Sequence, residues 1–74
     1  HHGDILIIDR SLNARDGDII IAVLYGEFTV KQLSIVNDTF FLIPKNSEYL
    51  PVEILDEMDF EIWGVVTYSI RKHR

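Results

Sequence analysis

The apolar run at residues 19–25, Ile-Ile-Ile-Ala-Val-Leu-Tyr, constrains the fold more than any other feature of this chain. β-Branched side chains predominate in it and every position is apolar, which is typical of a β-strand buried on both faces. The next residues, Tyr25-Gly26-Glu27, predict a tight hairpin turn, because glycine readily adopts the backbone angles of such turns. Residues 27–36 follow as the partner strand, so the middle of the chain is predicted to be a β-hairpin.

The rest of the chain repeats this pattern of short apolar stretches separated by turn signals. We expect further strands at residues 4–9, 39–43, 52–55 and 60–70, of which 52–55 is an edge strand. Asn37-Asp38 indicates a second turn, and Gly64 indicates a bulge or bend inside the last strand. No segment has the 3.6-residue apolar period of an amphipathic helix. The sequence therefore predicts an all-β fold, a small, twisted and partly closed sheet rich in antiparallel strands.

A chain of 74 residues forms at most one small domain, and its sequence contains no cysteine. Domains of this size bury only about 60% of the surface that the unfolded chain exposes, so their stability is marginal. Disulfides and thiolate zinc sites are excluded as stabilising features, which leaves oligomerisation as the common route, and we expect a homodimer. The longest apolar run is far shorter than the ~20 residues that span a bilayer, so no membrane contact is expected.

The net charge of −5 argues against direct binding of DNA through a broad basic surface, because such binding depends on neutralising phosphates. The exception is the basic tail at residues 71–74, interpreted either as a solvated chain end or as a small contact patch for a partner. The acidic stretch at residues 56–61 is interpreted as a solvated turn, with a contact surface for a basic partner as the weaker alternative. The three histidines lie near the chain ends in no metal-ligand pattern, so no metal or cofactor is expected.

Lys31 is the candidate catalytic residue. Strand alternation puts it on the same face as Thr29 and Leu33, but both faces carry apolar residues, so the periodicity does not show which face is buried. The simplest interpretation is a strand lysine with its ammonium group in water, because lysine is rarely buried unpaired. The catalytic interpretation requires a desolvated amine, whose neutral form takes the proton of a serine hydroxyl as a general base.

Five blocks of sequence cover essentially the whole chain: residues 3–9 (GDILIID), 16–22 (DGDIIIA), 26–31 (GEFTVK), 42–49 (LIPKNSEY) and 63–67 (WGVVT). In order and spacing they resemble the UmuD/LexA-like family of self-cleaving serine peptidases, with the UmuD/MucA branch the most similar. The resemblance implies a sheet of the LexA and signal-peptidase type. It also implies that Lys31, which ends the Thr-Val-Lys segment, is the general base of a Ser-Lys pair.

In that family the nucleophilic serine lies in a Ser-Gly-(Asp/Ser)-Ser-Met motif, upstream of the pair that corresponds to Gly3-Asp4. This sequence does not contain the motif, so we interpret residues 1–74 as part of a C-terminal peptidase domain, and expect it to be inactive by itself. No serine of the chain sits in a nucleophile motif such as Gly-x-Ser-x-Gly. We interpret all four as structural: Ser11, Ser34, Ser47 and Ser69.

The resemblance implies that the parent protein is an autopeptidase of the bacterial SOS response to DNA damage. Stimulated by the RecA filament on single-stranded DNA, it would cleave itself, and the UmuD-like product would dimerise and join a UmuC-like polymerase for translesion synthesis. The alternative is the C-terminal dimerisation and self-cleavage domain of a LexA-like transcriptional repressor, with a helix-turn-helix domain upstream. Signal peptidase shares the Ser-Lys chemistry, but nothing in this sequence supports the membrane anchor that it requires. A cytoplasmic location is expected.

Overall fold

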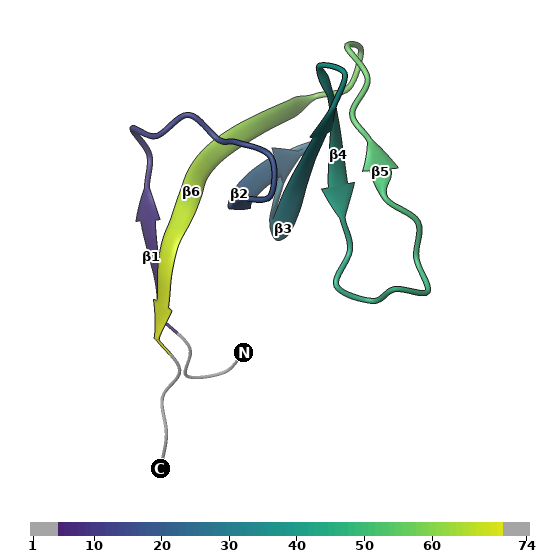
Figure 1. Cartoon of the computed structure of the whole chain (residues 1–74). Helices are drawn as coiled ribbons and strands as arrows, with labels where there is room; N and C mark the ends of the chain where they lie inside the picture. Colours follow the sequence, from purple (N-terminus) through teal and green to yellow (C-terminus); the bar gives the residue numbers. More distant parts are fainter. Residues whose placement is uncertain (1–4, 71–74) are drawn as a thin grey trace.

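The computed structural model describes the backbone of residues 5–70 and the side chains of residues 5–67. Its six strands are β1 (Ile5–Asp9), β2 (Ile19–Leu24), β3 (Glu27–Val36), β4 (Thr39–Ile43), β5 (Val52–Glu53) and β6 (Phe60–Ile70). They form one sheet in the order β1-β6-β2-β3-β4-β5, and every neighbouring pair is antiparallel (Figure 1). The predicted all-β fold is confirmed. The sheet is not closed into a barrel, because β1 and β5 form its two edges.

The predicted strand boundaries agree closely with those of the structure. Tyr25 leaves the predicted strand because it belongs to the hairpin turn, and the predicted strand at 52–55 ends at Glu53. The described residues form no helix that is long and apolar enough to cross a membrane. The interpretations of the three histidines and of the basic tail at 71–74 concern residues outside the described part of the chain.

β3 bends the sheet, because its two halves pair with different strands. Residues before Gln32 pair with β2, and residues after it pair with β4. Gln32 itself lies opposite Ile19 on one side and Ile43 on the other. Twisted strands that pair in this staggered way produce a coiled sheet instead of a flat one (Figure 1). β2 completes the centre of the sheet, since it pairs with β3 on one side and with β6 on the other.

The hydrophobic core lies on one face of this coiled sheet. Four strands contribute its buried members, which are Ile20, Ala22, Leu33, Leu42 and Val65. The prediction that β2 is buried on both faces is confirmed at its centre, where Ile21 on the opposite face is also buried. At the start of β2 the prediction is wrong, because Ile19 is 39% exposed. The side chain of Ile19 is thus open to water, and the second face of the sheet is only partly shielded.

The predicted irregularity at Gly64 is a β-bulge between β2 and β6. Ile21 lies opposite Gly64 and Ala22 lies opposite Ile62, so Trp63 is the extra residue on β6. A Cβ atom on Gly64 would overlap the Cγ2 atom of Ile8 in the neighbouring strand β1, so a larger residue here would force Ile8 to move. Glycine at this position thus leaves room for the Ile8 side chain beside β6.

Three aspartates shape the loop between β1 and β2. This loop crosses from the edge strand β1 to the centre of the sheet. Asp16 accepts a hydrogen bond from the Ile35 N–H at 2.8 Å, and Asp18 accepts one from the Arg15 N–H at 2.8 Å. The hydroxyl and the N–H of Ser11 both donate to Asp9, and these bonds hold the pKa of the Asp9 carboxyl below its usual value. These acidic residues therefore stabilise the loop, and Ser11 is a structural serine.

The two hairpin turns provide a test of turn chemistry. Tyr25-Gly26 and Asn37-Asp38 both have positive φ at the two central positions, as in type I′ turns. Asparagine tolerates this conformation, whereas tyrosine is strained by about 1–2 kcal/mol. We expect Tyr25→Asn to raise the free energy of unfolding by about 1 kcal/mol. Urea denaturation measures the change, and Tyr49→Asn, in an exposed loop, is the matched control. An unchanged or lower stability of Tyr25→Asn would contradict the expected strain.

Candidate active site

Lys31 lies near the middle of β3, and the structure decides which face of the strand it occupies. Lys31 pairs with Ile20 of β2, and Leu33 lies two residues further along β3. Both Ile20 and Leu33 are fully buried. Residues paired across strands share a face of the sheet, and so do residues two apart on one strand. The Lys31 side chain is therefore on the core face, where it is half-buried instead of fully solvated.

A threonine on the same strand holds the amine of Lys31. The Nζ atom donates a hydrogen bond to Thr29 Oγ1 at 2.7 Å and makes a longer contact, of 3.4 Å, with the carbonyl oxygen of Val30. Thr29 pairs with the buried Ala22, so its backbone is fixed at the centre of the sheet. Threonine is stiff at χ1, which makes its hydroxyl a well-positioned acceptor. The bond therefore restricts the direction in which the amine points.

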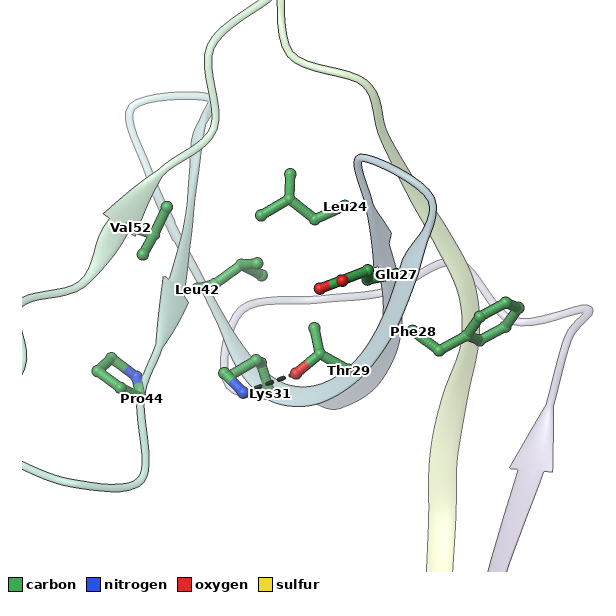
Figure 2. Close-up of a pocket in the computed structure, with 8 residues that line it drawn as sticks. All are labelled: Leu24, Glu27, Phe28, Thr29, Lys31, Leu42, Pro44 and Val52. Carbon is green, nitrogen blue, oxygen red and sulfur yellow. Dashed lines mark hydrogen bonds between the residues drawn. The ribbon is translucent and has the colours of Figure 1, made fainter.

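Lys31 lines a hollow of about 320 Å³ on the core face (Figure 2). Three other strands contribute apolar residues to its walls: Leu24 from β2, Leu42 from β4 and Val52 from β5. Glu27 also lines the hollow, so an exposed carboxylate lies at its rim. Figure 2 shows Lys31, Thr29 and Glu27 following one another along β3 beside this space. The hollow is thus apolar in its walls and polar along one strand.

A second hollow, of about 300 Å³, adjoins Lys31 as well. Both hollows include Lys31 and Pro44 in their lining, and the second adds Gln32 and Lys45. Lys31 thus lines both hollows, although the second also includes Ile19, Val30 and Gln32, which face the opposite side of the sheet.

None of the described serines is positioned to react with this amine. Ser11 donates its hydroxyl hydrogen to Asp9 at 2.6 Å. Ser34 lies on β3 at an odd spacing from the lysine and so faces the other side of the sheet, and Ser47 is exposed between β4 and β5. The side chain of Ser69 lies outside the described residues. Within the described part of the chain, the site supplies a positioned amine and an apolar hollow without a nucleophile.

Such an amine has two chemical uses. In its protonated form it binds a carboxylate or a developing oxyanion, and in its neutral form it accepts the proton of a hydroxyl group. Either use requires a reacting group from outside the described residues, because none of the described serines is positioned beside the amine.

Comparison with known proteins decides the family. A model of the family described as Peptidase S24-like matches residues 1–67. The chain belongs to the Peptidase S24-like family. This confirms the resemblance to UmuD/LexA-like proteins that the sequence blocks predicted, and it places the chain in a family of peptidases.

Curated relatives from several bacteria agree with this Peptidase S24-like assignment. Protein MucA of Salmonella typhimurium is 44% identical over 75 aligned residues, which include 99% of this chain and 50% of MucA. LexA repressor 2 of Xanthomonas axonopodis pv. citri is 38% identical over 73 residues, with 99% of this chain and 34% of the repressor covered. The LexA repressor of Stenotrophomonas maltophilia is 38% identical over 72 residues, with 97% and 34% covered. The chain thus spans about half the length of MucA and a third of the repressors.

Thr29 is the residue of this Peptidase S24-like site that sequence reasoning missed. The Thr-Val-Lys segment indicates Lys31 as the base but assigns no role to its threonine. The available signal was its spacing, because residues two apart on a strand lie on the same face. A hydroxyl at that spacing from a lysine is within reach of its amine, as the 2.7 Å bond shows.

Proposed function

We propose that this chain is the base-bearing part of a Ser-Lys autopeptidase, with Lys31 as the general base. The observation that carries the proposal is the half-buried side chain of Lys31, which lines a hollow on the core face and donates a hydrogen bond from Nζ to Thr29. Membership of the Peptidase S24-like family supports the reaction class. The nucleophilic serine would come from a segment of the parent that precedes Gly3.

In the proposed reaction, the neutral amine of Lys31 takes the proton of the serine hydroxyl while the serine oxygen attacks the carbonyl carbon of the scissile peptide bond. The C–N bond then breaks, the proton passes from Lys31 to the leaving amine, and an ester of the serine remains. Lys31 next takes a proton from water, the resulting hydroxide attacks the ester, and the proton returns to the serine oxygen. Residues 1–74 by themselves would supply the base but not the nucleophile, and would therefore be inactive.

The parent protein would be of the UmuD type. In this proposal, the RecA filament on single-stranded DNA stimulates self-cleavage in the cytoplasm during the SOS response. The cleaved product then becomes a subunit of a UmuC-like translesion polymerase. The higher identity to MucA than to the LexA repressors supports this choice.

The second candidate is the C-terminal domain of a LexA-like repressor, which the identity to LexA repressors supports. The two candidates differ in what precedes the peptidase domain. A short N-terminal arm in the parent gene is expected for the UmuD type, and a helix-turn-helix domain would select the repressor. In a gel-shift experiment, retention of operator-type DNA by the purified parent would overturn the UmuD proposal.

We also expect the chain to form a homodimer. The open sheet leaves β1 and β5 as edge strands in the described part of the chain, and their unpaired backbone groups are available to another copy. A small core without disulfides gains stability from such an association. Sedimentation equilibrium over a range of concentrations measures the mass in solution. A monomer at the highest concentration would contradict the expectation.

Thr29 provides a test of how Lys31 is positioned. Thr29→Val keeps the shape of the side chain but removes the acceptor of the Lys31 hydrogen bond. We expect self-cleavage of the parent to slow by about 2- to 10-fold, as for loss of one hydrogen bond that orients a neutral amine. Thr29→Ser should keep most of the rate because it keeps the hydroxyl. The matched control is Thr39→Val on β4, and an equal loss in this control would show a general effect on the sheet.

A further inference from the structure

The β2–β3 hairpin exposes two aromatic side chains near the acidic turn that precedes β6. Phe28 is 62% exposed and Tyr25 is 64% exposed. Phe28 lies on the face of the sheet opposite Lys31, because the two residues are an odd number of positions apart on β3. Phe28 is among the residues that line the hollow beside Lys31, but in Figure 2 its ring points away from it. The Phe28 ring therefore belongs to a different surface from the Lys31 amine.

The aromatic cluster on this surface already binds one arginine of its own chain. The rings of Phe28 and Trp63 meet edge to face, with centroids 5.7 Å apart and an angle of 70° between their planes. The Arg10 guanidinium carbon lies 3.9 Å from the centre of the Trp63 ring, and Nε of Arg10 donates to the Trp63 carbonyl oxygen at 2.8 Å. Trp63 is thus engaged, whereas most of the Phe28 ring remains open to solvent.

A carboxylate lies on the same face as Phe28. Phe28 pairs with Val23 of β2, and Val23 pairs on its other side with Glu61 of β6. Residues paired across strands share a face, and neighbouring strands are about 4.8 Å apart, so Phe28 and Glu61 are separated by roughly 10 Å. Val23 forms a half-buried apolar floor between them. A guanidinium group stacked on Phe28 can reach the Glu61 carboxylate over this floor.

The segments around the hairpin carry acidic residues, and Arg10, stacked on Trp63, is a basic residue beside its aromatic cluster. The sequence has no lysine or arginine at residues 16–30 or 46–70. The exposed carboxylates of these two segments include Glu27, Asp56, Glu57, Asp59 and Glu61. The N–H of Tyr25 donates to the Asp59 carbonyl oxygen at 2.8 Å, which attaches the hairpin turn to the acidic turn. The acidic turn therefore lies beside the hairpin turn, and these two segments contribute no positive charge of their own.

Tyr25 also occupies a position where a tyrosine is unfavourable. Its φ of 50° is in the left-handed region, which disfavours a bulky side chain at this turn position. Strained residues of this kind concentrate at functional sites. A tyrosine that weakens the fold and remains exposed is accounted for if its ring contacts a partner.

We infer that Tyr25, Phe28, Glu61 and the acidic turn at residues 56–59, called here the hairpin surface, dock an arginine-bearing segment of a partner protein. Arginine fits the surface better than lysine because its planar guanidinium group stacks on an aromatic ring and also pairs with a carboxylate. The acidic charge of the surface attracts such a segment over a distance. This inference is independent of the proposed peptidase function.

The test is a titration of the 74-residue chain with a hexa-arginine peptide at low ionic strength, with a hexalysine peptide of equal charge as comparison. Binding is followed by ¹H–¹⁵N NMR, in which the single tryptophan, Trp63, gives one indole N–H signal beside the surface. We expect hexa-arginine to bind at least about threefold more tightly, as for stacking at an exposed site. The largest shifts should lie in the hairpin and in the acidic turn.

Variants separate stacking from net charge. Phe28→Leu, Tyr25→Asn and Glu61→Gln are each expected to weaken hexa-arginine binding by about two- to fivefold. Tyr25→Asn is informative because it removes strain, so weaker binding cannot result from a weaker fold. The matched controls are Tyr49→Asn and Glu53→Gln, which change exposed residues outside the surface. Equal affinity for the two peptides, or equal losses in the controls, would overturn the inference and indicate attraction by charge alone.

Discussion

Replacement of Lys31 by alanine in the parent protein is expected to lower the rate of self-cleavage by about 100- to 10,000-fold, the usual contribution of a positioned general base. Alanine removes the amine that β3 places beside the hollow on the core face. The fold should survive, because the Lys31 side chain is half-buried and bonds within its own strand. Electrophoresis of the parent over time measures cleavage, and circular dichroism measures the fold.

Lys31→Arg distinguishes a base from a merely cationic residue. Arginine keeps the positive charge but is never deprotonated in proteins, so it cannot take the proton of serine. We expect the same loss as for alanine. Lys45→Ala is the matched control, because Lys45 lines the second hollow but is exposed and is given no role in the chemistry. The proposal is wrong if Lys31→Arg cleaves normally, or if the 74-residue chain cleaves an intact parent by itself.

Local signals explain why so much of the fold was predictable. The apolar run of β2 and the turn at Gly26 lie within one hairpin, and hairpins depend on residues close together in sequence. The bulge at Gly64 was predictable for a similar reason, because glycine inside a strand often marks a bulge or a close approach by a neighbouring group. Here the overlap of a Cβ atom with Ile8 gives the physical cause.

Long-range pairing explains what the sequence did not reveal. Periodicity alone left both faces of β3 possible for Lys31, and only the pairing with Ile20 showed that its amine faces the core. The contact between Arg10 and Trp63 joins residues 53 positions apart, so no local pattern indicates it. The candidate base was therefore predictable from a segment that resembles a family. Its hydrogen bond to Thr29 and the aromatic cluster required the structure.

The largest expected effect on stability is that of Leu33→Ala. Leu33 is fully buried, lies on the same face of β3 as Lys31, and pairs with Leu42, which is 2% exposed. Removing such a side chain costs about 2–5 kcal/mol, through lost burial and the cavity that remains. Small domains have only about 0.05–0.15 kcal/mol of stability per residue, so this loss is a large fraction of the total. We expect most of the variant to be unfolded at 37 °C.

Leu50→Ala is the matched control for this prediction, because it makes the same chemical change at a side chain that is 84% exposed. Its free energy of unfolding should change by less than about 0.5 kcal/mol. Urea denaturation followed by Trp63 fluorescence measures both variants, since the chain has a single tryptophan. If Leu33→Ala loses no more stability than Leu50→Ala, the core face assigned to β3 is wrong. The half-buried position of Lys31 depends on the same assignment, so it would then be wrong as well.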